Sequence, residues 1–237
     1  GYAPIHLIPA ADRQKAPDAG RAAIDIGATS KAGAERLVKL GDYATFRTGF
    51  QVLDEEGART VKGKAFDDRA GCAALVELLR ADYAVDLYAV FTTQEEAGLR
   101  GARVAAYAVH PDVAFSLEGT ICDDLPKKDD VSPVTEVGKG PAITFMDQSI
   151  IADRRLVQLL TRTAERLGIP YQFKRAAAGG TDAGAIHLSR EGIPSAVVAV
   201  PARYIHAPVS VLSLDDLDHT VQLMTAALQS LEGGLDS

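Results

Sequence analysis

The spacing of apolar residues changes near Lys64, and beyond that residue short apolar runs alternate with amphipathic stretches. Runs that are apolar at nearly every position are typical of strands buried on both faces of a sheet. We therefore expect strands at residues 87–92, 113–117, 142–146, 171–174 and 195–200. We expect helices at residues 69–80, 101–108 and 154–167, a short helix carrying His187, and a final helix capped by Ser213 and Asp216. This alternation predicts an α/β fold with a mixed, mostly parallel sheet and flanking helices.

Residues 1–60 lack this alternation. A unit of this size buries little core by itself. The sequence therefore predicts two parts, a small β-rich unit over residues 1–60 and an α/β domain over residues 61–237. The elements expected in the first part are strands at 22–26, 43–50 and 52–53, and a helix at 31–40 with Ser30 as its N-cap.

The chain of 237 residues has a formal net charge of −7, with 47% hydrophobic and 24% charged residues. This composition is ordinary for a soluble globular protein, and the negative charge argues against a nucleic-acid binder, which needs a basic face. The two cysteines, Cys72 and Cys122, match neither a disulfide framework nor a cysteine zinc site. No apolar run reaches the length of a membrane span, so we expect a cytoplasmic protein.

Two adjacent carboxylates, Asp67 and Asp68, stand at the start of the helix expected at residues 69–80. Aspartate at a helix N-terminus accepts free N–H groups and suits the helix dipole, so capping explains one of them. Neighbouring carboxylates repel each other unless a cation, a base or water offsets their charge. Capping alone leaves the second carboxylate unexplained.

Four further side chains, Glu95, Glu96, Glu118 and His206, each follow the end of an expected strand. In open α/β sheets ligands bind outside the carboxyl ends of the strands, so these side chains should converge on one edge. Taken singly, each has an ordinary explanation, such as a solvated loop carboxylate or a core histidine with a satisfied hydrogen bond. Their occurrence at successive strand ends favours a shared site.

Carboxylates and imidazole are ligands that suit zinc, cobalt or manganese, and the lack of cysteine ligands argues against structural zinc. Two metal ions about 3.5–4 Å apart and sharing one carboxylate would hold a water molecule and a scissile carbonyl group. One member of the Glu95–Glu96 pair would then bind metal, while its neighbour takes the proton from the water. The pattern therefore predicts a dinuclear hydrolytic centre.

Five motifs occur in order through most of the chain: AFDDRAGCAAL, TTQEEAGLRGA, LEGT, GGTDAGA and RYIHAP. Together they resemble the glutamyl-aminopeptidase-like, tetrahedral aminopeptidases, dinuclear metallopeptidases that are sometimes labelled cellulases or endoglucanases. The resemblance implies a zinc-exopeptidase-like fold, peptide substrates and two divalent ions, zinc or cobalt. It also implies homo-oligomers, from dimers to a dodecamer.

The resemblance further implies a role for individual positions. Asp67 would bridge the two metal ions, and Asp68 would lie behind it, often through a cis peptide, and orient a ligand. Glu95 would be the general base, which makes it a catalytic residue together with Asp68.

The other implied ligands are Glu96 and His206 on one metal ion and Glu118 on the second. A further set of positions matches the loops with which the family shapes its substrate pocket. These positions are Gly180, Thr181, Asp182, Arg203 and Tyr204.

The family carries one more histidine ligand near its N-terminus, in an Asp-x-His motif that this chain lacks. His6, His110 and His187 match no ligand position of the family. We therefore expect the chain to lack the family's N-terminal segment. Residues 1–60 would correspond to the later part of an inserted dimerisation domain, and the metal site at Glu118 would be one ligand short.

The leading hypothesis from the sequence is a metal-dependent aminopeptidase that uses metal-activated water and Glu95 as general base. An amidohydrolase or deacylase acting on small N-acyl compounds would use the same carboxylates and stays open. A third hypothesis is a truncated, non-catalytic chain with a role in assembly, which the missing histidine motivates.

Overall fold

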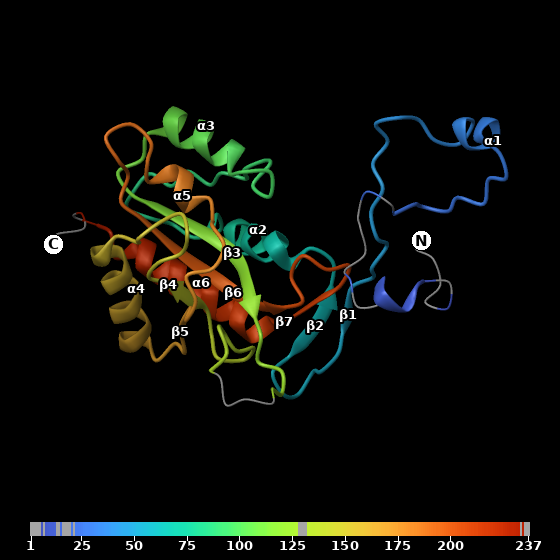
Figure 1. The fold of residues 1–237 in the computed structure, drawn as a ribbon. Helices are drawn as coiled ribbons and strands as arrows, with labels where there is room; N and C mark the ends of the chain where they lie inside the picture. Colours follow the sequence, from blue (N-terminus) through green and yellow to red (C-terminus); the bar gives the residue numbers. More distant parts are fainter. Residues whose placement is uncertain are drawn as a thin grey trace. The chain divides into compact units, whose positions relative to one another are not determined.

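The computed structural model describes residues 6, 8–12, 15, 20, 22–127, 132–232 and 234 (Figure 1). The chain divides into two compact units, Gly1–Thr45 and Phe46–Ser237. The boundary comes before the expected one at residue 60, because the segment after Thr45 leads into strands that pair with the sheet of the larger unit. The assignment of the first residues to an inserted dimerisation domain stays a prediction.

The described residues of the first unit form two short helical segments, η2 (Ala10–Asp12) and α1 (Lys31–Glu35). Ser30 caps α1 as expected, because its side chain accepts a hydrogen bond from the Gly33 N–H. The helix ends earlier than the expected residue 40.

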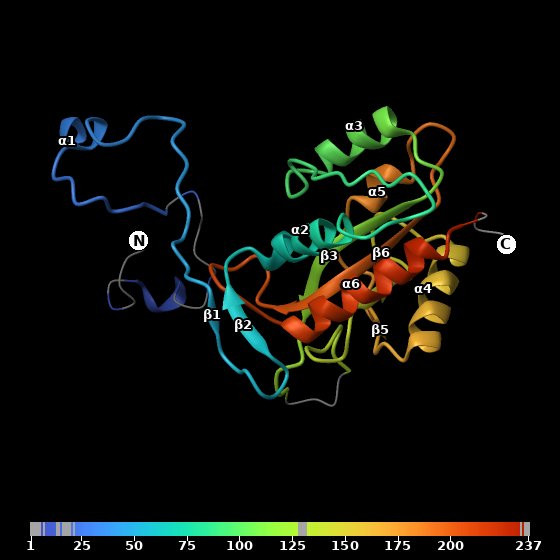
Figure 2. The same ribbon diagram turned by 180° about the vertical axis from the view of Figure 1, so that it is seen from behind.

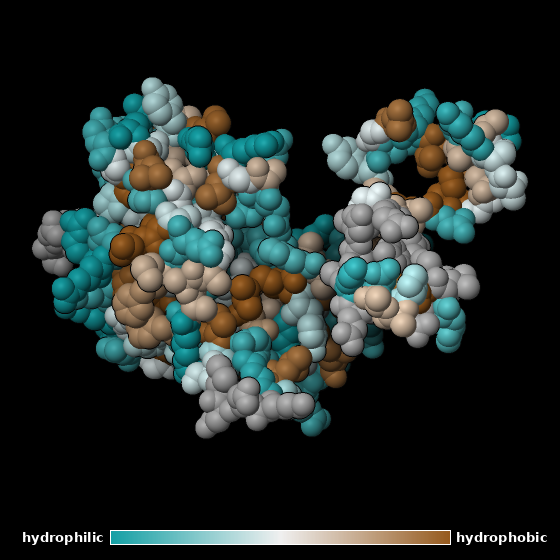
Figure 3. Space-filling view, in the orientation of Figure 1, coloured by the Kyte–Doolittle hydropathy of each residue, from teal (hydrophilic) through white to brown (hydrophobic). Residues whose placement is uncertain are grey.

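The strands expected at residues 22–26 and 43–50 do not form, so the described part of the first unit is not β-rich. A strand is stable only when a neighbouring strand completes its hydrogen bonds, and the described residues offer no such neighbour here. The side chains of Leu40 and Tyr43 are fully exposed, and Figure 3 shows apolar residues on the surface of this unit. These apolar side chains therefore have no core of their own to stabilise a sheet.

The second unit is built on one seven-stranded sheet of described residues (Figure 1). β6 lies at its centre, with β3 along one side and both β4 and β7 along the other. The strands are β1 (Gln51–Val52), β2 (Thr60–Gly63), β3 (Ala114–Cys122), β4 (Ala142–Thr144), β5 (Gln172–Phe173), β6 (Ser195–Arg203) and β7 (Ser210–Ser213).

The prediction of a mostly parallel sheet is wrong. Among the described strands only β3–β6 and β4–β5 pair in parallel, and the other pairings are antiparallel. A short turn after β6 brings β7 back beside it, and a turn of that length requires antiparallel pairing. Continuous apolar strands show that both faces of a sheet are covered, whichever way the neighbouring strands run.

The strand expected at residues 87–92 is also absent, although that segment is ordered and described. Among the described residues no other strand pairs with it, so its backbone lacks the ladder that defines a strand. The remaining expected strands do form, with changed ends.

Five helices in the described part of the chain flank the sheet. In Figure 1 and in the reverse view of Figure 2, α3 and α5 lie together, apart from α4 and α6. Alternate residues of β6 face the two layers: Val198 packs in one core with side chains of α4 and α6, and Val197 packs against Ala183 of α5. The helices are α2 (Phe66–Leu78), α3 (Arg100–Val109), α4 (Arg154–Leu167), α5 (Ala183–Ile186) and α6 (Leu214–Gln229).

The start of α6 differs from the expected capping box. Ser213 is the N-cap, and its hydroxyl accepts hydrogen bonds from the N–H groups of Asp215 and Asp216. The buried carboxylate of Asp216 does not return to Ser213 but accepts the N–H groups of Gly138 and Gly140, each at 2.7 Å. Asp216 therefore fastens a distant loop to the helix, and burial raises the pKa of its carboxyl.

None of the helices in the described part of the chain is both long and apolar enough to span a membrane. Apolar side chains nevertheless remain on the surface of the second unit, including Tyr88, Phe91 and Val104. Two of these belong to the unpaired segment at residues 87–92.

α2 lies unusually close to β3, and Gly71 makes this approach possible. A Cβ atom at Gly71 would clash with the backbone oxygen of Leu117 and would lie 2.5 Å from a carboxylate oxygen of Asp68. Both neighbours are held in place, one by the sheet and one by the helix start, so neither can move aside easily.

We expect Gly71→Ala to destabilise the fold by about 1–3 kcal/mol, the cost of overpacking a rigid contact. The free energy of unfolding from urea titration measures this loss. Gly49→Ala is the control, since a Cβ atom there meets nothing within 4 Å, and it should change stability by less than about 0.5 kcal/mol. Equal stability of the two variants would contradict the contact.

Candidate metal centre

The two aspartates at the start of α2 have different local roles. Asp67 and Asp68 have non-helical backbone angles and are joined by a cis peptide bond, which the resemblance implied. Asp68 Oδ1 accepts the N–H of Gly71 at 2.9 Å, so Asp68 is the residue that caps the regular part of the helix. Asp67 has no such bond to the helix, which leaves its carboxylate available to the centre.

The structure brings the predicted ligands into two groups that share Asp67. In the first group, His206 Nε2 lies 3.2 Å from Asp67 Oδ2 and 3.5 Å from Glu96 Oε2. In the second group, one oxygen each of Asp67, Asp68 and Glu118 lie within 4.8 Å of one another. The first group is open to solvent at Glu96 and His206, whereas Glu118 in the second group is buried.

Several residues that flank these ligands have a strained backbone. Ala65, Gln94, Tyr204 and His206 have φ angles of 54°, 60°, 62° and 59°, in the left-handed region that residues with a Cβ atom rarely adopt. Such conformations persist only where the surrounding structure imposes them, and they concentrate at functional sites. Their position next to the candidate ligands favours a functional reading of this edge.

Glu118 is buried at the second position of the motif LEGT, and it lies inside β3 rather than after the end of a strand as expected. Its Oε1 accepts the Ser116 hydroxyl at 2.7 Å and the Asp182 N–H at 3.3 Å. Burial raises the pKa of Glu118 to about 8. The hydrogen bond from Ser116 acts to lower this pKa, whereas the negative charge of Asp182 raises it further. Burial and the charge of Glu118 raise the pKa of Asp68 to about 9.

Glu95 lies close enough to Asp182, Glu96 and Asp67 for their charges to act on its carboxyl group. Burial raises the pKa of Glu95 to about 7, with further increases from the negative charges of Asp182, Glu96 and Asp67. Burial likewise raises the pKa of Asp67. A carboxyl with a pKa near 7 can both accept and return a proton at neutral pH.

The donor set fits divalent cations. Within the described residues, no ion pair joins a lysine or arginine to the carboxylates of this centre. The basic group that pairs with them is the imidazole of His206, which lies next to Asp67 and Glu96. Crowded carboxylates with raised pKa values indicate a missing positive charge. Oxygen and nitrogen donors that converge on shared points match zinc or cobalt.

The residues predicted to shape the substrate pocket are only partly brought to this centre. Asp182 lies against Glu118, and its Oδ2 accepts the Thr92 hydroxyl at 2.5 Å. Arg203 instead makes a bidentate ion pair with Asp124, at 2.6 and 2.7 Å. Burial acts to raise the pKa of the Asp124 carboxyl, but the hydrogen bonds from Arg203 and the Val137 N–H outweigh it, so the pKa is lowered.

The other three pocket candidates are placed separately. Thr181 bonds to the carboxylate of Asp147, and Gly180 packs next to Ser149. Tyr204 is about half exposed, at 49%, in the turn that carries His206. No described contact therefore joins Gly180, Thr181 or Tyr204 to the two ligand groups.

Sequence reasoning missed three polar residues around the centre. Ser116 lies two positions before Glu118 on the same face of a strand, so the period-2 pattern contains that signal. Thr92 and Lys174 carry no such local signal, since they approach the centre only through tertiary structure. Burial lowers the pKa of Lys174, while the charges of Asp147 and Glu118 oppose that effect.

The sequence matches the family model described as M42 glutamyl aminopeptidase over residues 1–223. The chain belongs to the M42 glutamyl aminopeptidase family. A protein of Acetivibrio thermocellus, named provisionally as an aminopeptidase, is 41% identical over 207 residues, which are 86% of this M42 chain and 61% of that relative. The lysyl aminopeptidase of Pyrococcus furiosus is 32% identical, over 98% of this chain and 67% of its own length.

Solved structures agree with this assignment. The TET aminopeptidase of a marine-sediment thaumarchaeon is 39% identical with a TM-score of 0.89, over 96% of this M42 chain and 65% of that structure. TET1 of Pyrococcus horikoshii is 35% identical with a TM-score of 0.69, over 86% of this chain and 59% of its own. A Thermotoga maritima structure with the same TM-score of 0.69 and 33% identity, over 88% of this chain and 60% of its own, bears the name endoglucanase.

These matches confirm the predicted family, including the endoglucanase label that some of its members bear. They also show that this M42 chain spans about three fifths to two thirds of its relatives' length. Membership of the family implies a dinuclear metal centre, and the two groups that share Asp67 are the candidates for it.

The raised pKa values predict how the stability of the metal-free M42 chain depends on pH. Glu118 and Asp68 have folded pKa values of about 8 and about 9, against ordinary values near 4. Their contribution to stability is therefore complete below about pH 4 and is lost as the pH rises to about 9. The melting temperature of chelator-treated protein should fall over this range.

Glu118→Gln should flatten this fall, because the amide does not titrate, whereas Glu55→Gln in an exposed loop should leave the slope unchanged. Added zinc should raise the melting temperature most at the alkaline end, where the carboxylates are charged. An unchanged slope in Glu118→Gln would show that this carboxyl does not hold its proton in the folded protein.

Proposed function

We propose that this chain carries the catalytic centre of a metal-dependent aminopeptidase that removes the N-terminal residue from peptides. The observation that carries the proposal is the membership of Asp67 in both ligand groups, with Glu95 beside them at a pKa of about 7. Family membership supports the same activity.

In this proposal Asp67 bridges two divalent ions, which are zinc or cobalt. Glu96 and His206 hold one ion, and Glu118 holds the other, with Asp68 fixed behind Asp67 by its bond to the helix. The ions would act as Lewis acids toward the scissile carbonyl and would lower the pKa of water. The crowding of carboxylates without a lysine or arginine partner among the described ion pairs supports this role.

Glu95 is the proposed general base. It takes a proton from the attacking water and gives that proton to the amine that leaves. A pKa of about 7 suits both steps at neutral pH, because the group is neither a permanent acid nor a permanent base. Burial is the main cause of that value, and the negative charges of Asp182, Glu96 and Asp67 add to it.

The charge of the centre favours substrates with a free amino group. Five carboxylates face a single imidazole in the two groups and at Glu95, and two divalent cations would offset four of these five charges, so only a small surplus of negative charge would remain at the edge. A peptide N-terminus brings a positive α-ammonium group to this edge, whereas an N-acyl compound brings none. Charge complementarity thus supports aminopeptidase over deacylase activity.

Residues Gly180, Thr181, Asp182 and Tyr204 are proposed to border the substrate site. Arg203 fits a supporting role better, because its guanidinium is already held by Asp124 just before the turn that carries His206. We also propose a homo-oligomer. Support comes from TET1 of Pyrococcus horikoshii, which can assemble into a tetrahedron or an octahedral shell.

The sharing of Asp67 predicts distinct metal losses. Asp67→Asn should remove most metal from both positions, because each ligand group loses a member. His206→Ala should lower only the share of metal bound with Glu96. Elemental analysis after dialysis measures both, with His110→Ala as the control, since that histidine pairs with Glu191 outside the two groups. Equal metal content in Asp67→Asn and the unmodified chain would contradict the bridging role.

Glu95→Gln should retain metal yet lose roughly 10²–10⁴-fold in hydrolysis of aminoacyl-anilides, since an amide cannot carry the proton. Matched N-blocked anilides test the alternative: preferred hydrolysis of the blocked compounds would replace the aminopeptidase proposal with a deacylase. A metal-loaded chain that hydrolyses neither class would support the assembly role. Full activity of Glu95→Gln would exclude Glu95 as base.

A further inference from the structure

The two proposed metal positions differ in what holds their ligands. The exposed position comprises Asp67, Glu96 and His206, and the buried position comprises Asp67, Asp68 and Glu118. The His206 side chain is 64% exposed, and within the described chain its imidazole pairs with Asp67 and Glu96 but has no hydrogen bond to a residue behind it. A metal-binding histidine is usually oriented by a hydrogen bond from its second ring nitrogen. The place of His206 therefore depends on the backbone that carries it.

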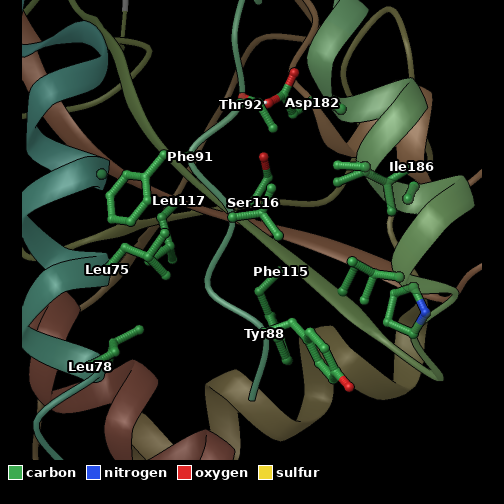
Figure 4. Close-up of a pocket in the computed structure, with 18 of the residues that line it drawn as sticks. Leu75, Leu78, Tyr88, Phe91, Thr92, Phe115, Ser116, Leu117, Asp182 and Ile186 are labelled. Atoms are coloured by element: carbon green, nitrogen blue, oxygen red, sulfur yellow. Dashed lines mark hydrogen bonds between the residues drawn. The ribbon is translucent and has the colours of Figure 1, made fainter. Parts of the chain in front are cut away.

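The buried position is oriented by direct contacts instead. The Glu118 carboxylate accepts the Ser116 hydroxyl at 2.7 Å and the Asp182 N–H at 3.3 Å. Figure 4 shows Asp182 beside Thr92, whose hydroxyl donates to the Asp182 carboxylate. Hydrogen bonds of this kind fix a ligand side chain directly, whereas the exposed position needs another device.

His206 lies in the turn that joins β6 to β7, and this turn has a strained backbone. Tyr204 and His206 have φ angles of 62° and 59°, a left-handed conformation that residues with a Cβ atom rarely adopt. Such angles persist only where the surrounding structure imposes them. Near the end of the turn the Thr48 hydroxyl donates to the Pro208 carbonyl at 2.6 Å. At its start stands Arg203, the last residue of β6.

The ion pair between Arg203 and Asp124 fixes the start of the turn. Arg203 Nε donates to Asp124 Oδ1 at 2.6 Å, and its Nη2 donates to Oδ2 at 2.7 Å, so two parallel bonds fix the plane of the guanidinium. The side chains are 28% and 11% exposed, so water competes less for these bonds than at an open surface pair. Because Arg203 directly precedes Tyr204, the pair fixes the direction in which the backbone leaves β6.

Asp124 is in turn anchored to the body of the domain. Its Oδ2 also accepts the Val137 N–H at 3.0 Å. The segment of residues 136–140 is tied to α6 through the carboxylate of Asp216 and to β5 through the side-chain amide of Gln172. Hydrogen bonds therefore connect a buried helix and a strand to the turn that carries the imidazole ligand.

We propose that Arg203 and Asp124 are positioning residues for the exposed metal position. Their ion pair holds the turn between β6 and β7 in its left-handed conformation, and this conformation directs the imidazole of His206 toward Asp67 and Glu96. Neither residue belongs to the two ligand groups, so both act through the backbone of the turn. The inference rests on the proposed function, because it takes His206 to be a metal ligand.

Zinc titration of the 237-residue chain tests this role. The imidazole NMR signal of His206, assigned by its loss in His206→Ala, reports on the exposed position, and total bound zinc gives the buried position by difference. Arg203→Lys keeps the positive charge but cannot make two parallel bonds to a carboxylate. It should weaken zinc binding at the exposed position by about 10–100-fold and leave the buried position unchanged.

Two further variants separate positioning from general loss of an ion pair. Arg59→Lys is the matched control, because Arg59 bonds to Asp215 and Asp218 outside the two ligand groups, and it should change zinc binding at neither position. The double variant Arg203→Lys with Asp124→Asn should lose no more affinity than the weaker-binding single variant, because both changes remove one interaction. If Asp124→Asn does not fold, Arg203→Lys alone decides.

Two results would overturn the inference while the ligand role of His206 stands. One is unchanged zinc affinity of the exposed position in Arg203→Lys, although His206→Ala lowers it. The other is equal weakening of both positions in Arg203→Lys, which a merely structural role of the ion pair would produce. If His206→Ala itself leaves zinc binding unchanged, the proposed ligand set fails and the inference falls with it, so the two failures are distinguished. None of these readouts uses hydrolysis.

Discussion

Five carboxylates meet at one edge of the sheet, those of Asp67, Asp68, Glu95, Glu96 and Glu118, and each repels the others. Burial makes the repulsion stronger, because it removes the water that would otherwise screen these charges. The protein can hold such a group either by keeping protons on it or by binding cations. The raised pKa values of Asp68, Glu95 and Glu118 show the first solution in the metal-free chain.

The fold supports this crowding by fixing each carboxylate from a different element. Asp68 is fixed by the Gly71 N–H, and Glu118 by Ser116 and the backbone of α5. The absence of a side chain at Gly71 and Gly119 lets α2 approach β3 so closely that the two carboxylates become neighbours. A bulkier residue at either position would separate the groups that the centre requires.

Sequence alone determined those features that depend on local patterns. The apolar spacing of α4 and its end at Gly168, with φ of 66°, follow from periodicity and from the freedom of glycine. The motifs also pointed to the carboxylates and His206, which the structure brings into two groups, although Glu118 lies inside β3 and no described strand comes directly before Glu95. Tertiary structure decided the rest. Strand direction and the failure of residues 87–92 to form a strand depend on which backbone lies alongside. The partners of Arg203 and Asp216 likewise lie far away in the sequence, and no local pattern encodes them.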